Sequence, residues 1–178
     1  MPLSIDRHAW RRIAPFVAFM LLLAWRGWLP ADNRLGLDPR WLYGASVLVV
    51  GALLAWWWRG YRELARDALP SAGEAALAAA IGVAVFALWI TLDAPWMIVG
   101  EPAASFVPLA DDGAVDVSLV AVRWLGAALL VPVMEELFWR SWLMRWLVDA
   151  RFDAVPAQRV GPRAVLLSTL AFVLVHNL

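Results

Sequence analysis

The sequence PVMEELFWR at residues 132–140 decides the fold of this chain, because it places three charges inside a long apolar stretch. The charged residues are Glu135, Glu136 and Arg140. A charged side chain at the centre of a membrane helix costs roughly 2.5–3.5 kcal/mol on insertion scales. Charges at that depth are paired, functional or both, so this stretch predicts a functional site inside a membrane-spanning helix.

The composition of the whole chain is that of a polytopic membrane protein. Of its 178 residues, 63% are hydrophobic, and the mean hydropathy is +0.68, which is too apolar for a soluble domain of this size. The chain has no cysteine, which excludes disulfides and thiolate metal sites. Its formal net charge is zero, so the lipid bilayer is an expected partner and nucleic acid is not.

Five apolar segments predict an all-α fold, a polytopic bundle of about five transmembrane helices in one membrane-embedded domain. The segments are residues 13–29, 41–58, 75–92, a span within 117–148, and a span that begins at 164 and is still apolar at 178. Because a spanning helix needs about 20 residues, the last segment is short. We therefore expect residues 1–178 to be the N-terminal part of a longer domain.

The distribution of arginines predicts the orientation of the chain in the membrane. Three arginines lie in each of the segments 7–12, 59–74 and 149–163, whereas 93–116 has five acidic residues and no arginine. Cytoplasmic loops carry an excess of basic residues. We therefore expect the N-terminus and the other two arginine-rich segments in the cytoplasm, and 93–116 outside.

The positions of Glu135 and His176 within their spans predict that the two residues lie at one depth. If the fourth span runs from near Arg123 to near Val148, Glu135 is about 20 Å from its cytoplasmic end at 1.5 Å per residue. His176 is about 18 Å from the start of the fifth span on the same scale. A register that begins six residues earlier places Glu135 nearer the cytoplasmic exit, and we prefer the first because Arg123 then anchors the outer end.

The spacing of the charged residues predicts how they pair. Glu136 and Arg140 are four residues apart and share a helix face, whereas Glu135 is rotated away by about 100°. On the fifth span Ser168, Phe172 and His176 recur at intervals of four and also share a face. Two simpler interpretations remain open, namely a structural ion pair that holds helices in register and a histidine at a membrane interface.

Together these residues resemble a known family. The Glu135-Glu136-x-x-x-Arg140 pattern is similar to the EExxxR motif of the CAAX-protease and bacteriocin-processing family of intramembrane proteases, and Phe172-x-x-x-His176 is similar to its FxxxH motif. The order of the motifs also fits, and the resemblance is best over residues 105–178. The longer string MEELFWRSWLMRWL resembles the bacterial subgroup associated with exosortase systems, which implies a multi-pass protein of the bacterial inner membrane.

The resemblance implies a glutamate-dependent endopeptidase that cleaves a membrane protein or a lipid-associated peptide near the cytoplasmic leaflet. In this family Glu135 and His176 would activate the attacking water, while Glu136, Arg140 and Phe172 would shape the site. The family is often described as metalloproteases, but two histidines in the whole chain make a zinc site of three or four protein ligands unfavourable. We therefore expect no metal or other cofactor.

One departure from the family pattern is important. Further family motifs, a histidine followed by an asparagine, supply oxyanion-stabilising groups and would follow Leu178. We therefore expect residues 1–178 alone to be inactive. The alternative function is a non-catalytic membrane protein, such as an immunity or assembly factor, in which Glu136 and Arg140 form a structural pair.

Overall fold

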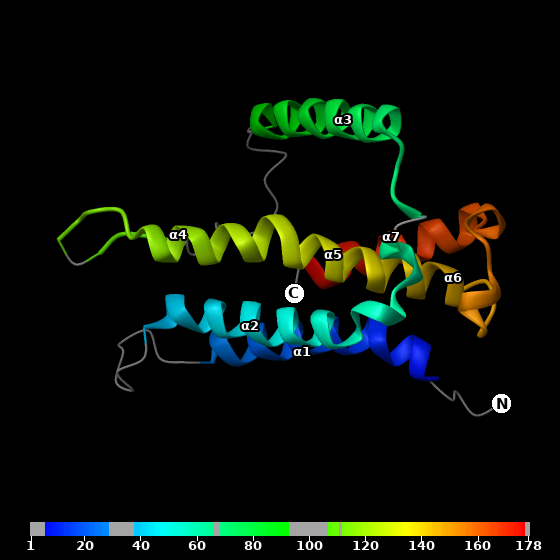
Figure 1. Ribbon diagram of the computed structural model, residues 1–178, viewed down its shortest axis with the longest axis horizontal. Helices are drawn as coiled ribbons and strands as arrows, with labels where there is room; N and C mark the ends of the chain where they lie inside the picture. The colour runs from blue at the N-terminus through cyan, green and yellow to red at the C-terminus, as the bar shows by residue number, and fades with distance from the viewer. Residues whose placement is uncertain (1–5, 29–37, 66–67, 93–106, 111, 177–178) are drawn as a thin grey trace. The chain divides into compact units, whose positions relative to one another are not determined.

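The computed structural model of the chain describes residues 6–28, 38–65, 68–92, 107–110 and 112–176, which are mainly helical (Figure 1). The main helical segments are α1 (Arg7–Gly27), α2 (Pro39–Trp57), α3 (Ala72–Thr91), a long rod (Val117–Trp146) and α7 (Pro162–His176). Short 3₁₀ turns are η1 (Trp58–Gly60), η2 (Arg62–Leu64), η7 (Phe152–Ala154) and η8 (Ala157–Arg159). This confirms the all-α fold. The chain divides into two compact units, Met1–Gly60 with Phe106–Leu178, and Tyr61–Ser105.

Three of the helices are long and apolar enough to cross a membrane, namely Arg40–Gly60, Ala72–Thr91 and Val117–Trp146. The helix α7 is apolar but shorter, at 15 residues. The helix α1 is 21 residues long and contains four arginines. The five expected segments therefore correspond to five helical segments, of which three meet the criteria for a membrane span among the described residues.

The rod is one continuous helix whose hydrogen-bond pattern changes along its length. It consists of α4 (Val117–Trp124), the π-helical η5 (Leu125–Leu130), α5 (Val131–Glu135), the π-helical η6 (Glu136–Leu143) and α6 (Met144–Trp146). Pro132 lies in the short α-helical piece between the two π-helical pieces. Proline has no N–H to donate and its ring collides with the carbonyl four residues earlier, so a regular α-helical ladder cannot continue through it. The wider turns of η5 and η6 are of the rare kind that is frequent at functional sites.

In the second unit, α3 begins with a reciprocal cap. The Ser71 hydroxyl accepts the Glu74 backbone N–H at 3.3 Å, and the Glu74 carboxylate accepts the Ser71 backbone N–H at 2.8 Å. This arrangement satisfies two backbone donors that the first turn of a helix otherwise leaves unpaired. Every residue of α3 is exposed, and the helix is apolar on all sides, which suits a helix surrounded by lipid.

In the first unit, the rod packs closely on α2 because glycines leave room at the contact. A Cβ atom at Gly126 of the rod would collide with the hydroxyl of Tyr43 and the side chain of Val47. Cβ atoms at Gly44 and Gly51 of α2 would each lie 3.4 Å from a side chain of the rod. Small residues are the usual means by which membrane helices approach one another closely.

At one end of this unit, the start of α1 packs against the end of the rod. Arg12 of α1 is 4% exposed, and its Nε donates to Oγ of Ser141 at 2.9 Å. Ala9 and Ile13 of α1 form a buried cluster with Phe152 of η7. The start of α1 and the segment after the rod therefore lie at a common end, which agrees with their expected place on one side of the membrane. Which side that is stays a prediction.

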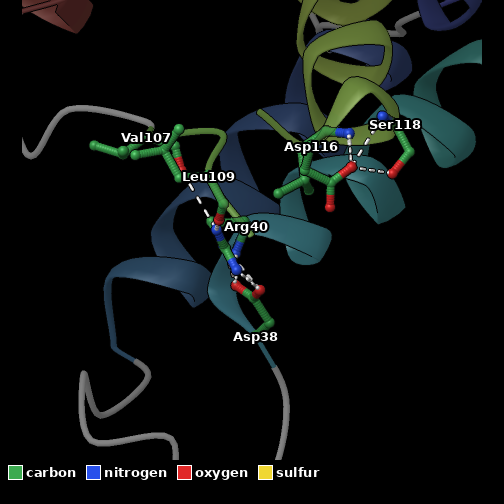
Figure 2. Close-up of polar contacts among 7 residues, drawn as sticks. Asp38, Arg40, Val107, Leu109, Asp116 and Ser118 are labelled. Atoms are coloured by element: carbon green, nitrogen blue, oxygen red, sulfur yellow. Dashed lines mark hydrogen bonds and ion pairs between the residues drawn. The ribbon is translucent and has the colours of Figure 1, made fainter. Parts of the chain in front are cut away.

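A polar cluster lies where α2 and the rod begin (Figure 2). Asp38 caps α2 and accepts hydrogen bonds from Arg40 at 2.6–3.0 Å. The same guanidinium donates to the carbonyl oxygen of Leu109 at 2.5 Å. Asp116 caps the rod by accepting the backbone N–H groups of Ser118 and Leu119 at 2.9 and 3.1 Å. Arg40 therefore ties the start of α2 to the segment that leads into the rod.

Candidate active site

Glu135 and His176 meet between the rod and α7. Nε2 of His176 lies 3.5 Å from Oε1 of Glu135, and the side chains are 45% and 26% exposed, respectively. Glu135 is the last residue of α5, and His176 is the last residue of α7. The structure therefore confirms that these two side chains face each other, as the matched depths predict. Their catalytic role stays a prediction.

The ring and the backbone carbonyl of Phe172 both contact the imidazole of His176. Nδ1 of His176 lies 2.9 Å from the Phe172 carbonyl oxygen, and the Phe172 and His176 rings stack at 4.0 Å with an angle of 28°. A carbonyl oxygen only accepts, so Nδ1 carries a proton when this hydrogen bond forms. Nε2 of the neutral ring then presents its lone pair on the side of Glu135.

The aromatic support continues from Phe172 into the rod and α1. The ring of Trp139 meets Phe172 edge-on at 5.4 Å, and Phe16 of α1 stacks on Phe138 at 3.9 Å. Phe138 and Trp139 themselves meet edge-on at 4.8 Å. A continuous row of rings therefore joins the first helix to the histidine.

Glu136 and Arg140 form the expected pair. Nη1 of Arg140 lies 2.9 Å from Oε1 and 3.1 Å from Oε2 of Glu136. The two side chains are 55% and 72% exposed, respectively. Both residues belong to η6, so this contact lies within one helix and does not fasten two helices together. The contact between Glu135 and His176, by contrast, joins the rod to α7.

A cavity of about 310 Å³ lies beside these residues. From the rod it is lined by Glu135, Glu136, Trp139, Arg140 and Met144. From α7 it is lined by Ser168, Thr169 and Phe172. The cavity therefore brings two carboxylates, a guanidinium and two hydroxyls to one apolar-walled space, which is the composition of a site that orients a ligand.

The residues present do not form a zinc-binding set. Among the described residues there is no group of three or more histidine, cysteine, aspartate or glutamate side chains that could hold a metal ion. Catalytic zinc sites use three protein ligands, and Glu136 is already engaged with Arg140.

Sequence reasoning missed three residues of the cavity wall. Trp139 is a buried residue, 6% exposed, and it also lines the cavity. Its position one turn after Glu135 was an available signal. Met144 and Thr169 carry no such signal, because only the packing of α7 on the rod makes them part of the wall.

Part of the chain matches a known protein family. Residues 117–178 match the family described as type II CAAX prenyl endopeptidase Rce1-like. Neither a curated protein nor a solved structure matches the chain. The matched segment holds the rod, α7, the Glu135–His176 contact and the whole cavity wall. This part of the chain is therefore similar to a family of CAAX prenyl endopeptidases.

Proposed function

We propose that the protein is an intramembrane endopeptidase in which Glu135 and His176 together activate the attacking water. The observation that supports this most strongly is the 3.5 Å contact between Glu135 Oε1 and His176 Nε2 at a cavity lined by Glu135. Ionisable residues within membrane helices mark functional sites by default. Here two such groups from different helices converge on one point.

The reaction is hydrolysis, and these two side chains move its protons. A water beside the pair donates one hydrogen bond to the carboxylate and one to Nε2, each about 2.8 Å long. The carboxylate takes a proton as the water oxygen bonds to the scissile carbonyl carbon. The carbon–nitrogen bond then breaks as a proton passes to the leaving amine. General acid–base groups of this kind typically contribute about 10²–10⁴-fold to the rate.

The substrate is a peptide bond in a membrane protein or a lipid-associated peptide near the cytoplasmic leaflet. The resemblance of MEELFWRSWLMRWL to the exosortase-associated subgroup supports a protein of the bacterial inner membrane, with its N-terminus in the cytoplasm. The arginine-rich segments at the common end of α1 and the rod support the same orientation.

The non-catalytic alternative has less support from the geometry. A structural lock needs a contact between two helices, whereas the Glu136–Arg140 contact lies within η6. The two side chains are also more than half exposed, so the pair is not buried between two helices. We assign Glu136 and Arg140 to the cavity wall, where the two opposite charges neutralise each other.

The test is cleavage by the protein expressed from its complete gene and reconstituted in phospholipid vesicles. A library of apolar peptides is added, and the products are identified by mass spectrometry. Glu135→Gln and His176→Ala are each expected to lower the cleavage rate by at least about 10²-fold, whereas Asp149→Asn, an exposed carboxylate outside the cavity, is not. Wild-type cleavage by a well-folded Glu135→Gln variant would refute the mechanism and favour the immunity or assembly factor.

A further inference from the structure

The cavity extends well beyond the residues to which the proposed reaction assigns a role. Glu135 lines one part of it, whereas Met144 and Ser168 line another. Met144 is nine positions after Glu135 along the rod, which at 1.5 Å per residue is at most about 13 Å. The cavity therefore has a reactive end and a distal end.

The helix α7 gives the same distance independently. His176 contacts Glu135, and Ser168 and Thr169 lie eight and seven positions earlier on α7. These separations correspond to about 12 and 10 Å. Because α6 and α7 are in contact and both Met144 and Ser168 line the cavity, the distal end has a wall from each helix. Between the two ends, Trp139 and Phe172 form the aromatic middle of the wall.

This length suits a segment of extended peptide. An extended chain advances about 3.3 Å per residue, so 10–13 Å corresponds to three or four residues. A peptide backbone inside an apolar site needs hydrogen-bond partners for its N–H and C=O groups. The hydroxyls of Ser168 and Thr169 can both donate and accept. Ser168 is 3% exposed, so it belongs to the interior wall rather than to the surface.

We propose that Met144, Ser168 and Thr169 form a specificity subsite for the substrate. It receives an apolar side chain three or four residues from the scissile bond, and the position of that bond rests on the function proposed above. Met144 sets the size of the accepted side chain, because its flexible thioether chain adapts to irregular apolar space. The two hydroxyls bind the backbone of the same substrate residue.

Binding selection tests the subsite without relying on cleavage. The Glu135→Gln protein in vesicles is incubated with a library of peptides randomised at successive positions, and the retained sequences are read. Adding Met144→Ala is expected to shift the preference at one substrate position towards larger apolar residues. The ratio of large to small retained residues should rise by at least about tenfold, since a single methylene in an apolar pocket changes selectivity by about that factor. Leu166→Ala, an exposed truncation on α7 outside the cavity, is the matched control and is expected to leave the preference unchanged.

Thr169→Val provides a second measurement, because it keeps the shape of the side chain and removes the hydroxyl. It is expected to weaken the binding of all retained peptides without changing the preferred residue. An unchanged preference in Met144→Ala together with unchanged binding in Thr169→Val would overturn the subsite, as would an equal shift in Leu166→Ala. If instead the preference shifts but the wild-type protein shows no Glu135-dependent cleavage, the subsite stands and the proposed function fails.

Discussion

The guanidinium of Arg12 donates through Nε to Oγ of Ser141 at 2.9 Å, which joins residues 129 positions apart in the chain. Its Nη1 donates to the carbonyl oxygen of His8 at 2.9 Å, and its Cζ lies 5.1 Å above the ring of Phe152. Ser141 directly follows Arg140 on η6. The first helix lies outside the matched segment 117–178, yet it supports the part of the rod that carries the site.

Arg12→Ala is expected to lower the free energy of unfolding by about 1.5–3 kcal/mol, the usual contribution of a hydrogen bond that involves a charged group. The measurement is thermal unfolding of the purified protein in detergent. Arg7→Ala, an exposed arginine on the same helix, is expected to change stability by less than about 0.5 kcal/mol. Equal effects of the two substitutions would show that the buried contact is not a stabilising one.

Gly126→Ala is expected to destabilise the protein by about 1–3 kcal/mol, the usual cost of an extra methyl group in a close-packed contact. The physical reason is that the added Cβ would collide with the Tyr43 hydroxyl. The measurement is again thermal unfolding, with Gly82→Ala on α3 as the control, because nothing lies within 4 Å of a Cβ there.

Tyr43→Phe is expected to recover part of the stability lost in Gly126→Ala, because it removes the oxygen that the new methyl group meets. The control Gly82→Ala is expected to be neutral or slightly stabilising, since alanine is the better helix former. If Gly126→Ala unfolds like the wild type, α2 and the rod do not need this close approach.

The stability of the protein is expected to depend on the ionisation of Asp38. Hydrogen bonds from Arg40 hold the pKa of this carboxyl below its ordinary value. A depressed pKa in the folded state means that the unfolded state binds the proton more readily. The contribution of Asp38 is therefore present above about pH 3.9, the unfolded value, and is lost as the pH falls through the folded pKa.

Unfolding measured from pH 6 down to pH 3 tests this dependence. Asp38→Asn is expected to cost about 1 kcal/mol or less at pH 6, because the pair is partly exposed, and to flatten the acid limb of the stability curve. Asp153→Asn, at an exposed position, serves as the control. If the stability of Asp38→Asn falls at acid pH as steeply as that of the wild type, this carboxyl is not the source of the acid dependence.

Phe172→Leu is expected to lower kcat by about 10–100-fold and to raise KM by a smaller factor, because the ring also lines the cavity. The substitution keeps an apolar side chain but removes the ring that stacks on His176 at 4.0 Å, and small misplacements of a catalytic group carry costs of this size. Steady-state kinetics on a cleaved library peptide provide the measurement, with Leu170→Ala, an exposed truncation on α7, as the control. A raised KM with an unchanged kcat would instead mean that Phe172 contacts the substrate without positioning His176.

The orientation in the membrane is open to a direct test with fused reporters. A reporter that is active only outside the cytoplasm is expected to work when fused after Asp112 and to fail when fused after Arg59. The reason is the arginine excess in 59–74 and its absence from 93–116. The reverse pattern would invert the orientation that the arginines predict.

The contacts of the charged site were predictable from spacing. Glu136 and Arg140 pair because four residues bring two side chains to one helix face, and the meeting of Glu135 and His176 follows from their matched depths. The distal wall was not predictable, because Met144 and Thr169 are ordinary helix residues until α7 packs against α6. The apolar segment that begins at residue 13 also does not mark the start of α1. Hydropathy marks where the chain becomes apolar, whereas Asp6 begins the helix at Arg7 by accepting the N–H of Ala9 at 2.7 Å.

The π-helical turns of η6 have a consequence for how distant homologues should be compared. In a regular helix, each residue added or removed rotates everything beyond it by about 100°. A single deletion between Glu135 and Met144 would leave the hydropathy of the helix almost unchanged, yet it would turn one end of the cavity wall away from the other. A homologue with the same cavity must therefore preserve the number of residues between these positions, or change the type of turn to compensate. The alignment gap, rather than the amino-acid substitution, is the change to look for in this helix.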